Sequence, residues 1–391
     1  VFIKIPLTFE CTPSFSLYLS LKIGVIKMEN KQTQFNQFQI ALVAGATGFI
    51  GRFLIAELLS QGHQVFALVR DRAKQQKDME NWLKNKNIAF DQLRFIQGDI
   101  TQEDLAINPK HWEKLTTVNI LYNASALFAW NLSMREGRKV NVEGALNLLT
   151  CVNQHCDLVR VVHVSGYMLT LQDHLRQAGV CIDQPEQTNW QWVYQQLGTY
   201  EASKIEAHYA WIKQAQSLGL DWTVIHPATV ISDEVTGEIP VNQPIAHMIS
   251  LLKRKKMSAI PATPQHYLPL VSIDYLVKVI GYAATETRLA RSELLVAHEQ
   301  RLTLADMFNI MAAQVGQKAP TRYVSLDLLR MILKWKWLAQ KLEMSEEMLD
   351  FIRTEPLNVS ELKTLIQKWN IQESDLEKSL TKTSQWIYQH S

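Results

Sequence analysis

A tyrosine and a lysine four residues apart, Tyr200 and Lys204, form the pair in the sequence best suited to acid–base chemistry. Residues at this spacing share one face of a helix. A phenol has a pKa of about 10, which makes it a poor acid–base group at neutral pH. A nearby ammonium favours the phenolate and lowers that pKa. The pair therefore predicts that Tyr200 transfers a proton and that Lys204 activates it, although the same spacing also arises by chance on surface helices.

A glycine-rich turn lies earlier in the chain. It reads Gly45-Ala46-Thr47-Gly48-Phe49-Ile50-Gly51 and connects the apolar run Gln39–Ala44 to a helical pattern that ends at Gly62. Glycines at this spacing allow a tight turn, close approach of the backbone to a diphosphate, and close packing of helix on strand. The amides at the start of the helix stabilise phosphate charge. The turn predicts a dinucleotide site containing Gly45, Thr47, Gly48, Phe49, Ile50 and Gly51, and a purely structural turn is the alternative.

The residues after the next predicted strand, His63–Val69, bear on which dinucleotide binds. NAD-preferring folds place an acidic residue there, which bonds the ribose hydroxyls. Here Arg70 and Arg72 occupy this region and can make bidentate contacts with a 2′-phosphate. Asp71 between them could instead reach the ribose. The sequence thus favours NADP(H) as the cofactor and leaves NAD(H) possible; solvated surface arginines are the alternative.

Strand and helix patterns alternate through most of the chain. Further apolar runs typical of buried parallel strands are Leu93–Ile96, Val118–Tyr122, Val159–Val164 and Asp221–His226. This alternation predicts an α/β fold, a Rossmann-type doubly wound parallel sheet. We expect Leu268–Val271 to rejoin the edge of the sheet and the chain after about Thr285 to be mainly helical.

Three regions follow from these patterns. The first, residues 1–36, is an N-terminal extension in which Met28 is the predicted true start, with a weak membrane anchor as the alternative. Residues 37–285 form the predicted NAD(P)-binding domain, and residues 286–391 a smaller, mainly helical substrate lobe. Prolines and charges interrupt the apolar N-terminal segment, so no stable membrane insertion is expected.

The bulk composition is that of an ordinary globular protein. The formal net charge is +2 over 391 residues, which gives no indication of a nucleic-acid partner. No zinc-type pattern surrounds the four cysteines, so reduced, mostly buried thiols in a cytoplasmic protein are expected.

Several ordered motifs together resemble one family. They are Gly45–Gly51, Gly98-Asp99-Ile100, Asn123-Ala124-Ser125-Ala126, Val140–Gly144, His163-Val164-Ser165, Tyr200–Lys204 and His226-Pro227-Ala228-Thr229. With these motifs the chain resembles an extended short-chain dehydrogenase/reductase from Gly45 to about Tyr275. Within that superfamily it is most similar to the branch of thioester reductase domains and fatty acyl reductases.

The resemblance implies further cofactor contacts. Asp99 and Ile100 would flank the adenine, Asn123 and Ala124 would pass beside the cofactor, Pro227 would border the nicotinamide, and Thr229 would belong to the same site. The local alternatives are turn capping for the aspartate, bonding of strand-end backbone for the asparagine and strand termination for the proline. Asn141 would support proton transfer or bond the backbone of its own helix.

One position departs from the family pattern. The family usually has Ser or Thr immediately after the position of Ser165, and this chain has Gly166 followed by Tyr167. Either Ser165 or Tyr167 would then polarise the substrate carbonyl. Loss of one donor at an oxyanion-type site typically costs about 3 kcal/mol of transition-state stabilisation.

The resulting hypothesis is a reductase that transfers hydride from NADPH to a carbonyl or acyl-thioester carbon. Tyr200 is its acid/base, Lys204 activates the tyrosine and Ser165 orients the oxygen. A nucleotide-sugar epimerase or dehydratase with bound NAD, and a non-catalytic dinucleotide-binding regulator, are the alternatives. The substrate is expected to be a small, partly hydrophobic molecule, and the sequence leaves its identity and the oligomeric state open.

Overall fold

The computed structural model describes residues 38–127, 132–343 and 349–391. The predicted start at Met28, the extension 1–36 and Cys11 lie outside the described residues. The other three cysteines are free thiols, buried for Cys151 and Cys156 and exposed for Cys181.

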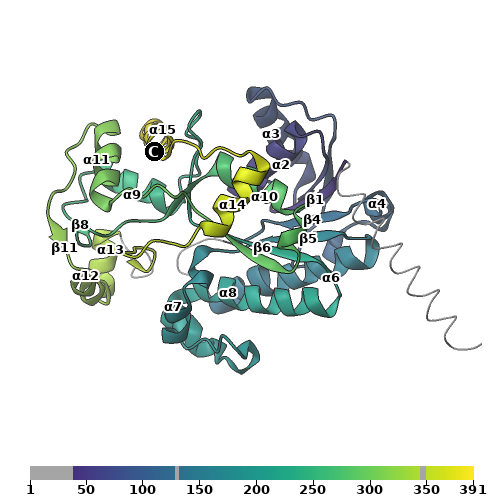
Figure 1. Cartoon of the computed structure of the whole chain (residues 1–391), viewed down its shortest axis with the longest axis horizontal. Coiled ribbons are helices and arrows are strands. Elements are labelled where there is room, and N and C mark those ends of the chain that lie inside the picture. Colours follow the sequence, from purple (N-terminus) through teal and green to yellow (C-terminus); the bar gives the residue numbers. More distant parts are fainter. Residues whose placement is uncertain (1–37, 128–131, 344–348) are drawn as a thin grey trace, which may run out of the picture. The chain divides into compact units, whose positions relative to one another are not determined.

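A central sheet of seven parallel strands carries the fold, in the order β3-β2-β1-β4-β5-β6-β10 (Figure 1). The strands are β1 Ile40–Ala44, β2 Gln64–Val69, β3 Leu93–Gln97, β4 Ile120–Asn123, β5 Arg160–Val164, β6 Trp222–Pro227 and β10 Ser292–Val296. The chain winds outward from β1 in both directions, because β1 pairs with both β2 and β4. The α/β Rossmann-type prediction is confirmed. In such sheets ligands bind beyond the carboxyl ends of the strands, where the winding direction reverses.

The central strands are apolar throughout because both faces of the sheet are covered. In β1, Ala41 and Val43 belong to one core cluster, whereas Leu42 and Ala44 belong to another. Side chains alternate between the two faces of a strand, so these clusters are the layers above and below the sheet.

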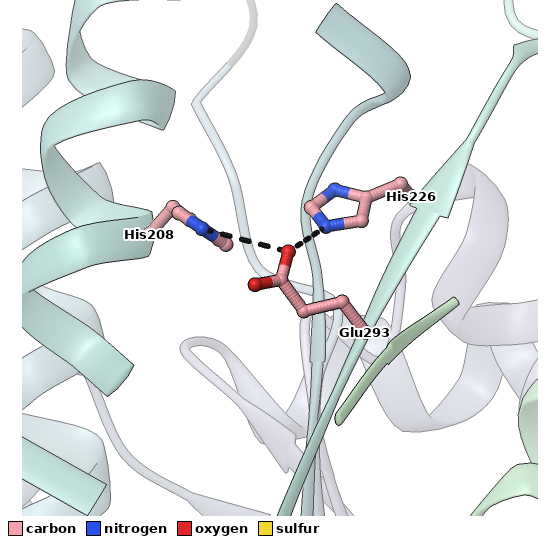
Figure 2. A group of neighbouring side chains, drawn as sticks. All are labelled: His208, His226 and Glu293. Atoms are coloured by element: carbon pink, nitrogen blue, oxygen red, sulfur yellow. Dashed lines mark hydrogen bonds and ion pairs between the residues drawn. The ribbon is translucent and has the colours of Figure 1, made fainter. Parts of the chain in front are cut away.

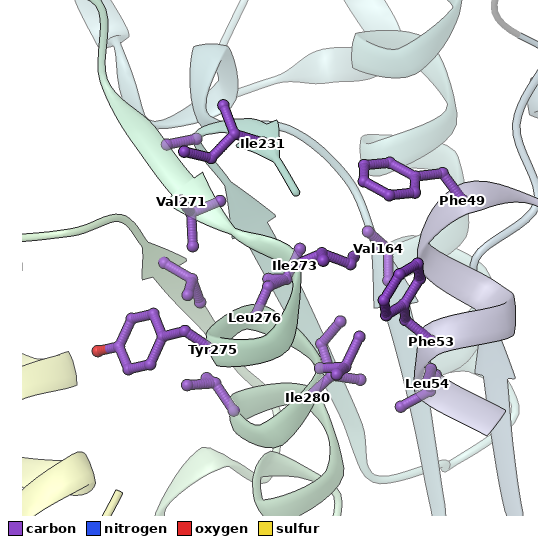
Figure 3. Packing of buried hydrophobic residues seen from close by; sticks show 14 of the residues in the cluster. Phe49, Phe53, Leu54, Val164, Ile231, Val271, Ile273, Tyr275, Leu276 and Ile280 are labelled. Carbon is purple, nitrogen blue, oxygen red and sulfur yellow. The ribbon is translucent and has the colours of Figure 1, made fainter. Parts of the chain in front are cut away.

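Helices from distant parts of the chain fill the two layers. On one face α2 packs against α10, and their side chains Phe53, Leu54, Leu276 and Ile280 interdigitate (Figure 3). On the other face α6 packs against α8, with Leu148 and the fully buried Trp211 in the second cluster. The helices of this part are α2 Phe49–Ser60, α3 Arg72–Asn85, α4 Pro109–Leu115, α5 Met134–Gly137, α6 Ala145–His155, α7 Gln172–Gln177, α8 Trp190–Ser217 and α10 Ile273–Ala283.

The remaining elements form a smaller assembly, in which α15 packs against α9 and α11. Its helices are α9 Pro244–Lys253, α11 Leu304–Gln314, α12 Leu326–Leu333, α13 Lys336–Leu342 and α15 Leu376–His390, whereas α14 Ser360–Trp369 packs against β10 of the central sheet. Two two-stranded sheets join it, one of β7 Thr229–Ile231 with β9 Leu270–Ser272, and one of β8 Ile260–Pro261 with β11 Tyr323–Val324. Among the described residues, no helix combines the length and apolar character needed to cross a membrane.

The prediction for the sheet edge is wrong. Leu268–Val271 does not rejoin the central sheet, because β9 pairs with β7 and leads directly into α10. The edge strand is instead β10, which pairs with β6 and lies beyond the predicted boundary at residue 285. A short apolar run such as Leu270–Ser272 carries no signal that distinguishes the two pairings.

Candidate active site

The glycine-rich turn has no room for side chains at two of its glycines. Gly45 has φ +76°, and a Cβ there would lie 2.5 Å from the carbonyl oxygen of Ala124. A Cβ on Gly51 would lie 2.1 Å from the carbonyl oxygen of Gly45. Gly45 therefore allows the chain after β1 to approach the backbone that follows β4. Gly51 allows α2 to pack closely on the turn, as the sequence predicts.

The middle glycine has a different environment. Gly48 is the N-cap of α2, and a Cβ there would approach only the carbonyl oxygen of Gly45, at 3.2 Å. Gly48 also lines the cavity described below. The first turn of α2 contains no acidic side chain. The amides at this helix start therefore fit a diphosphate, because their partial positive charge meets no competing carboxylate within this turn.

A depression of about 620 Å³ lies beyond the end of β2, beside the turn. Its lining includes Thr47, Arg70 and Lys74. Asp71 is the N-cap of α3, and its carboxylate accepts the backbone N–H of Lys74 at 3.2 Å. Arg72 is exposed and donates from Nε to Gln76 at 3.3 Å. Arg70 and Lys74 are cationic groups that could hold a phosphate. The carboxylates of Asp71 and Asp78 line the same depression, and Arg72 does not line it.

A largely apolar cavity of about 250 Å³ opens next to the turn. It is lined by Gly48, Phe49, Ile50, Ala124, Ala126, Ser165, Gly166, Tyr167, Met168, Tyr200, Glu201, Pro227, Ala228, Thr229, Val230, Gln243, Pro244, Met248, Leu268 and Phe351. The cavity therefore brings together the turn, the ends of β4, β5 and β6, and the start of the Tyr200 helix. Residues far apart in sequence meet here as the predicted topology requires.

A break in α8 positions Tyr200. Gly198 has φ +75° and ψ 171°, so α8 consists of two helical segments, and Tyr200 lies in the first turn of the second. Lys204 follows one turn later, is 4% exposed, and donates from Nζ to the carbonyl oxygen of Val164 at 2.8 Å. This bond ties α8 to the end of β5, immediately before Ser165.

The protonation of this pair differs from the expectation. Burial, with the Glu201 carboxylate as a second cause, raises the pKa of Tyr200 to about 12, whereas a lowered pKa was expected. Burial lowers the pKa of Lys204 to about 8. Near neutral pH the phenol is therefore protonated and able to donate, and most of the lysine is ammonium.

The structure distinguishes between the two candidate hydroxyl donors. The Tyr167 hydroxyl donates to the carbonyl oxygen of Phe351 at 2.6 Å, and burial raises the pKa of this phenol well above its ordinary value. Ser165 is buried, and its Oγ has no hydrogen-bond partner among the described residues. A buried hydroxyl without a partner is costly, so Ser165 fits a ligand oxygen better than Tyr167 does.

Three predicted residues make local contacts instead of lining the cavity. Asp99 accepts from the backbone N–H and the hydroxyl of Thr101, at 2.9 and 2.8 Å, which is the turn-capping alternative. Asn123 is fully buried, with its amide nitrogen 3.2 Å from Nδ1 of His163. Ile100 lines a separate depression with the α5 region. These side chains support the backbone beside the site.

Asn141 does not line the cavity either, and its hydrogen bonds differ from those expected. Its Oδ1 accepts the backbone N–H of Leu127 at 2.7 Å, and its Nδ2 donates to the hydroxyl of Ser203 at 2.9 Å. The interpretation that it bonds the backbone of its own helix is therefore wrong. The side chain instead joins the segment after β4 to the middle of α8.

Sequence reasoning missed Glu201 as a residue of the cavity. This side chain is 2% exposed, and its Oε1 lies 2.6 Å from Nε2 of His174. Burial raises the pKa of Glu201. Burial is also the largest single influence on His174 and lowers its pKa, but the hydrogen bond and the charge of Glu201 together raise that pKa above its ordinary value. Its position next to Tyr200 was the available signal. In sequence alone, however, a glutamate on a helix is more typical of a solvent-exposed face.

The parallel sheet, its glycine turn and the cavity at the switch point define an NAD(P)-dependent oxidoreductase of the short-chain dehydrogenase/reductase type. The model of the family described as "Male sterility protein", an NAD-binding family, matches residues 43–280. The chain belongs to this family, in the branch of the superfamily that contains thioester reductase-like proteins.

Sequence relatives include reductases, and solved structures share the fold. A putative dihydroflavonol 4-reductase of Synechocystis sp. is 22% identical over 89% of this chain and 94% of its own length. Human fatty acyl-CoA reductase 1 is 30% identical over a matched segment. That segment covers 32% of this chain and 27% of the length of the human protein. The terminal R domain of the myxalamid PKS-NRPS pathway shares the fold, with a TM-score of 0.69, 18% identity and coverage of 90% of this chain and 91% of that domain.

Proposed function

We propose that this protein is an NADPH-dependent reductase that delivers hydride to the carbonyl or acyl-thioester carbon of an apolar substrate. The observation that carries the proposal is the cavity at the glycine turn. The Ser165 hydroxyl, which has no hydrogen-bond partner within the described part of the chain, lines this cavity together with Tyr200 and Gly48 of the glycine-rich turn. The nicotinamide cofactor would supply the hydride.

The cofactor would lie along the turn, with its diphosphate on the start of α2. Gly45, Thr47, Gly48, Phe49, Ile50 and Gly51 would form this part of the site, and Ala124, Pro227 and Thr229 would border the nicotinamide. A 2′-phosphate would contact Arg70 and Arg72. Asp99, Ile100 and Asn123 would hold neighbouring backbone in place.

Two hydroxyls would act on the substrate oxygen. Negative charge develops on that oxygen as hydride reaches the carbon, and Ser165 Oγ would donate a hydrogen bond to it. Tyr200 would then donate its proton, since its raised pKa keeps it in the acid form. The Lys204 ammonium would stabilise the resulting phenolate, one helical turn away.

An apolar substrate is favoured by the lining of the cavity. Phe49, Met168, Met248, Leu268 and Phe351 all contribute to it. Phe351 comes from the region 286–391, and its carbonyl oxygen accepts from Tyr167 of the NAD(P)-binding region. Since β10 belongs to the central sheet, we propose that the part of this region after β10 contains the substrate lobe and closes one side of the cavity.

Replacing Ser165 with alanine is expected to lower kcat by about 10²–10³-fold, because one donor to the developing oxyanion is lost. The affinity for NADPH should not change, since this hydroxyl would face the substrate. Steady-state kinetics and a fluorescence titration with NADPH measure the two effects. Tyr167→Phe is the matched control, since its hydroxyl already bonds Phe351. A larger loss of kcat in Tyr167→Phe than in Ser165→Ala would contradict the role of Ser165.

Replacing both Arg70 and Arg72 with alanine is expected to weaken the binding of NADPH by about tenfold or more and to leave the binding of NADH nearly unchanged. Each charge-assisted contact with the 2′-phosphate contributes about 1.5–3 kcal/mol, and only NADPH carries that group. Paired titrations with the two nucleotides check this. Equal weakening of both nucleotides would remove the argument for NADP(H).

A further inference from the structure

Two histidines and a glutamate from three elements converge on one side of the sheet (Figure 2). His208 comes from α8, His226 from β6 and Glu293 from the edge strand β10. Nε2 of His226 lies 2.6 Å from Oε2 of Glu293, and Nε2 of His208 lies 3.6 Å from the same oxygen. One ligand atom from each residue lies within 4.8 Å of the other two.

The convergence has the geometry of a metal site. Figure 2 shows that both imidazole rings point an Nε2 at the same carboxylate oxygen, from opposite sides. Two imidazole nitrogens and one carboxylate oxygen form a ligand set that Zn²⁺ uses, with bonds of about 2.0–2.2 Å. Small side-chain rotations would seat an ion between the three atoms in place of the present Nε2–Oε2 contact.

The second nitrogen of His226 is already fixed. Its Nδ1 lies 3.0 Å from the carbonyl oxygen of Gly166, which can only accept, so Nδ1 carries a proton. A bond of this kind orients metal-binding histidines and leaves Nε2 as the ligand atom. The contact between Nε2 and the Glu293 carboxylate is 2.6 Å, and a bound ion would replace it.

The second histidine is buried. His208 is 4% exposed, and burial lowers its pKa to about 3, although the Glu293 carboxylate opposes this shift. Lys204, one turn earlier on α8, is the nearby positive group that opposes a cation, and the Glu293 carboxylate offsets it.

The site has an entry route. The Glu293 side chain is 42% exposed, and with His226 it lines a cavity of about 470 Å³. An ion could enter there, and water from the cavity could complete its coordination.

We propose that His208, His226 and Glu293 bind one divalent transition-metal ion, Zn²⁺ by preference, with water as the remaining ligand. This site adjoins Gly166, whose carbonyl oxygen contacts His226. Its three residues are not among the groups that would act on the substrate. A proton-bridged pair of His226 and Glu293 without metal affinity is the competing interpretation.

The test uses the full chain without a histidine tag, stripped with a chelator and titrated with Zn²⁺ against a chromogenic competitor. We expect one ion per chain. Glu293→Gln and His208→Gln should each weaken Zn²⁺ binding by at least about 100-fold. Even changes to residues that only contact the ligands of a metal typically lower the metal affinity 10–100-fold. Glu113→Gln and His390→Asn, at exposed positions away from this cavity, should bind as the wild type does.

Two readouts guard against a variant that fails to fold. Zn²⁺ should raise the Tm of the wild type and of both control variants but not that of Glu293→Gln, whose NADPH binding should persist. Co²⁺ should give the visible absorption of a low-coordinate nitrogen–oxygen site in the wild type. Zn²⁺ binding by the wild type no stronger than by Glu293→Gln and His208→Gln would overturn the proposal.

Discussion

Replacing Tyr200 with phenylalanine is expected to lower kcat by about 10²–10⁴-fold, the usual contribution of a positioned proton donor. The substitution removes only the phenolic oxygen and keeps the ring that lines the cavity. NADPH should therefore bind with nearly unchanged affinity. Steady-state turnover and a fluorescence titration with NADPH measure the two effects.

Tyr209→Phe is the matched control for this experiment. Tyr209 lies on the same helix but outside the lining of the cavity. Its replacement should leave kcat within a few-fold of the wild-type value. Similar turnover in Tyr200→Phe and Tyr209→Phe would remove Tyr200 from the proposed mechanism.

Replacing Gly51 with alanine is expected to weaken cofactor binding and to destabilise the fold together. The new methyl group would lie 2.1 Å from the carbonyl oxygen of Gly45, so α2 would have to move away from the turn. We expect a loss of about 1–3 kcal/mol in the free energy of unfolding, typical of overpacking, and at least tenfold weaker NADPH binding. Thermal unfolding and an NADPH titration give both values.

A second helical glycine provides the control. A Cβ on Gly281 in α10 would have its nearest neighbour at 3.7 Å, an ordinary contact, and the glycine has no positive φ. Gly281→Ala should therefore keep NADPH affinity and leave stability unchanged or higher, since alanine favours helix by about 1 kcal/mol over glycine. Gly51→Ala binding NADPH as tightly as Gly281→Ala would contradict the role given to the turn.

Local sequence signals carry most of the fold. The strands near β1 are apolar because both of their faces are buried, and the glycines of the turn occupy positions where a side chain would collide. The edge of the sheet lacked such a signal. β9 and β10 are both short and largely apolar, and only tertiary packing decides that β10 pairs with β6 while β9 pairs with β7.

The candidate site divides in the same way. Tyr200 and Lys204 are candidates on the basis of one helical turn of sequence. The preference for Ser165 over Tyr167 depends on a bond from Tyr167 to Phe351, which is 184 residues further along the chain. The pKa of Tyr200 also depended on tertiary structure, because burial opposes the effect expected from a nearby ammonium.

The cluster of His208, His226 and Glu293 has no sequence motif. Its members are neighbours only because α8, β6 and β10 meet at one edge of the sheet. Spacing rules find metal ligands within a short segment, and they do not apply to such a set.

Transfer of deuterium tests the central claim most directly. The protein would be incubated with NADPH carrying deuterium at both hydrogen positions of nicotinamide C4 and with a panel of long-chain aldehydes, ketones and acyl-coenzyme A thioesters, and the products analysed by mass spectrometry. We predict one deuterium on the former carbonyl carbon of a product, with one NADPH oxidised for each deuterium transferred. NADPH that binds but transfers deuterium to no member of the panel would contradict the account and favour a dinucleotide-binding regulator.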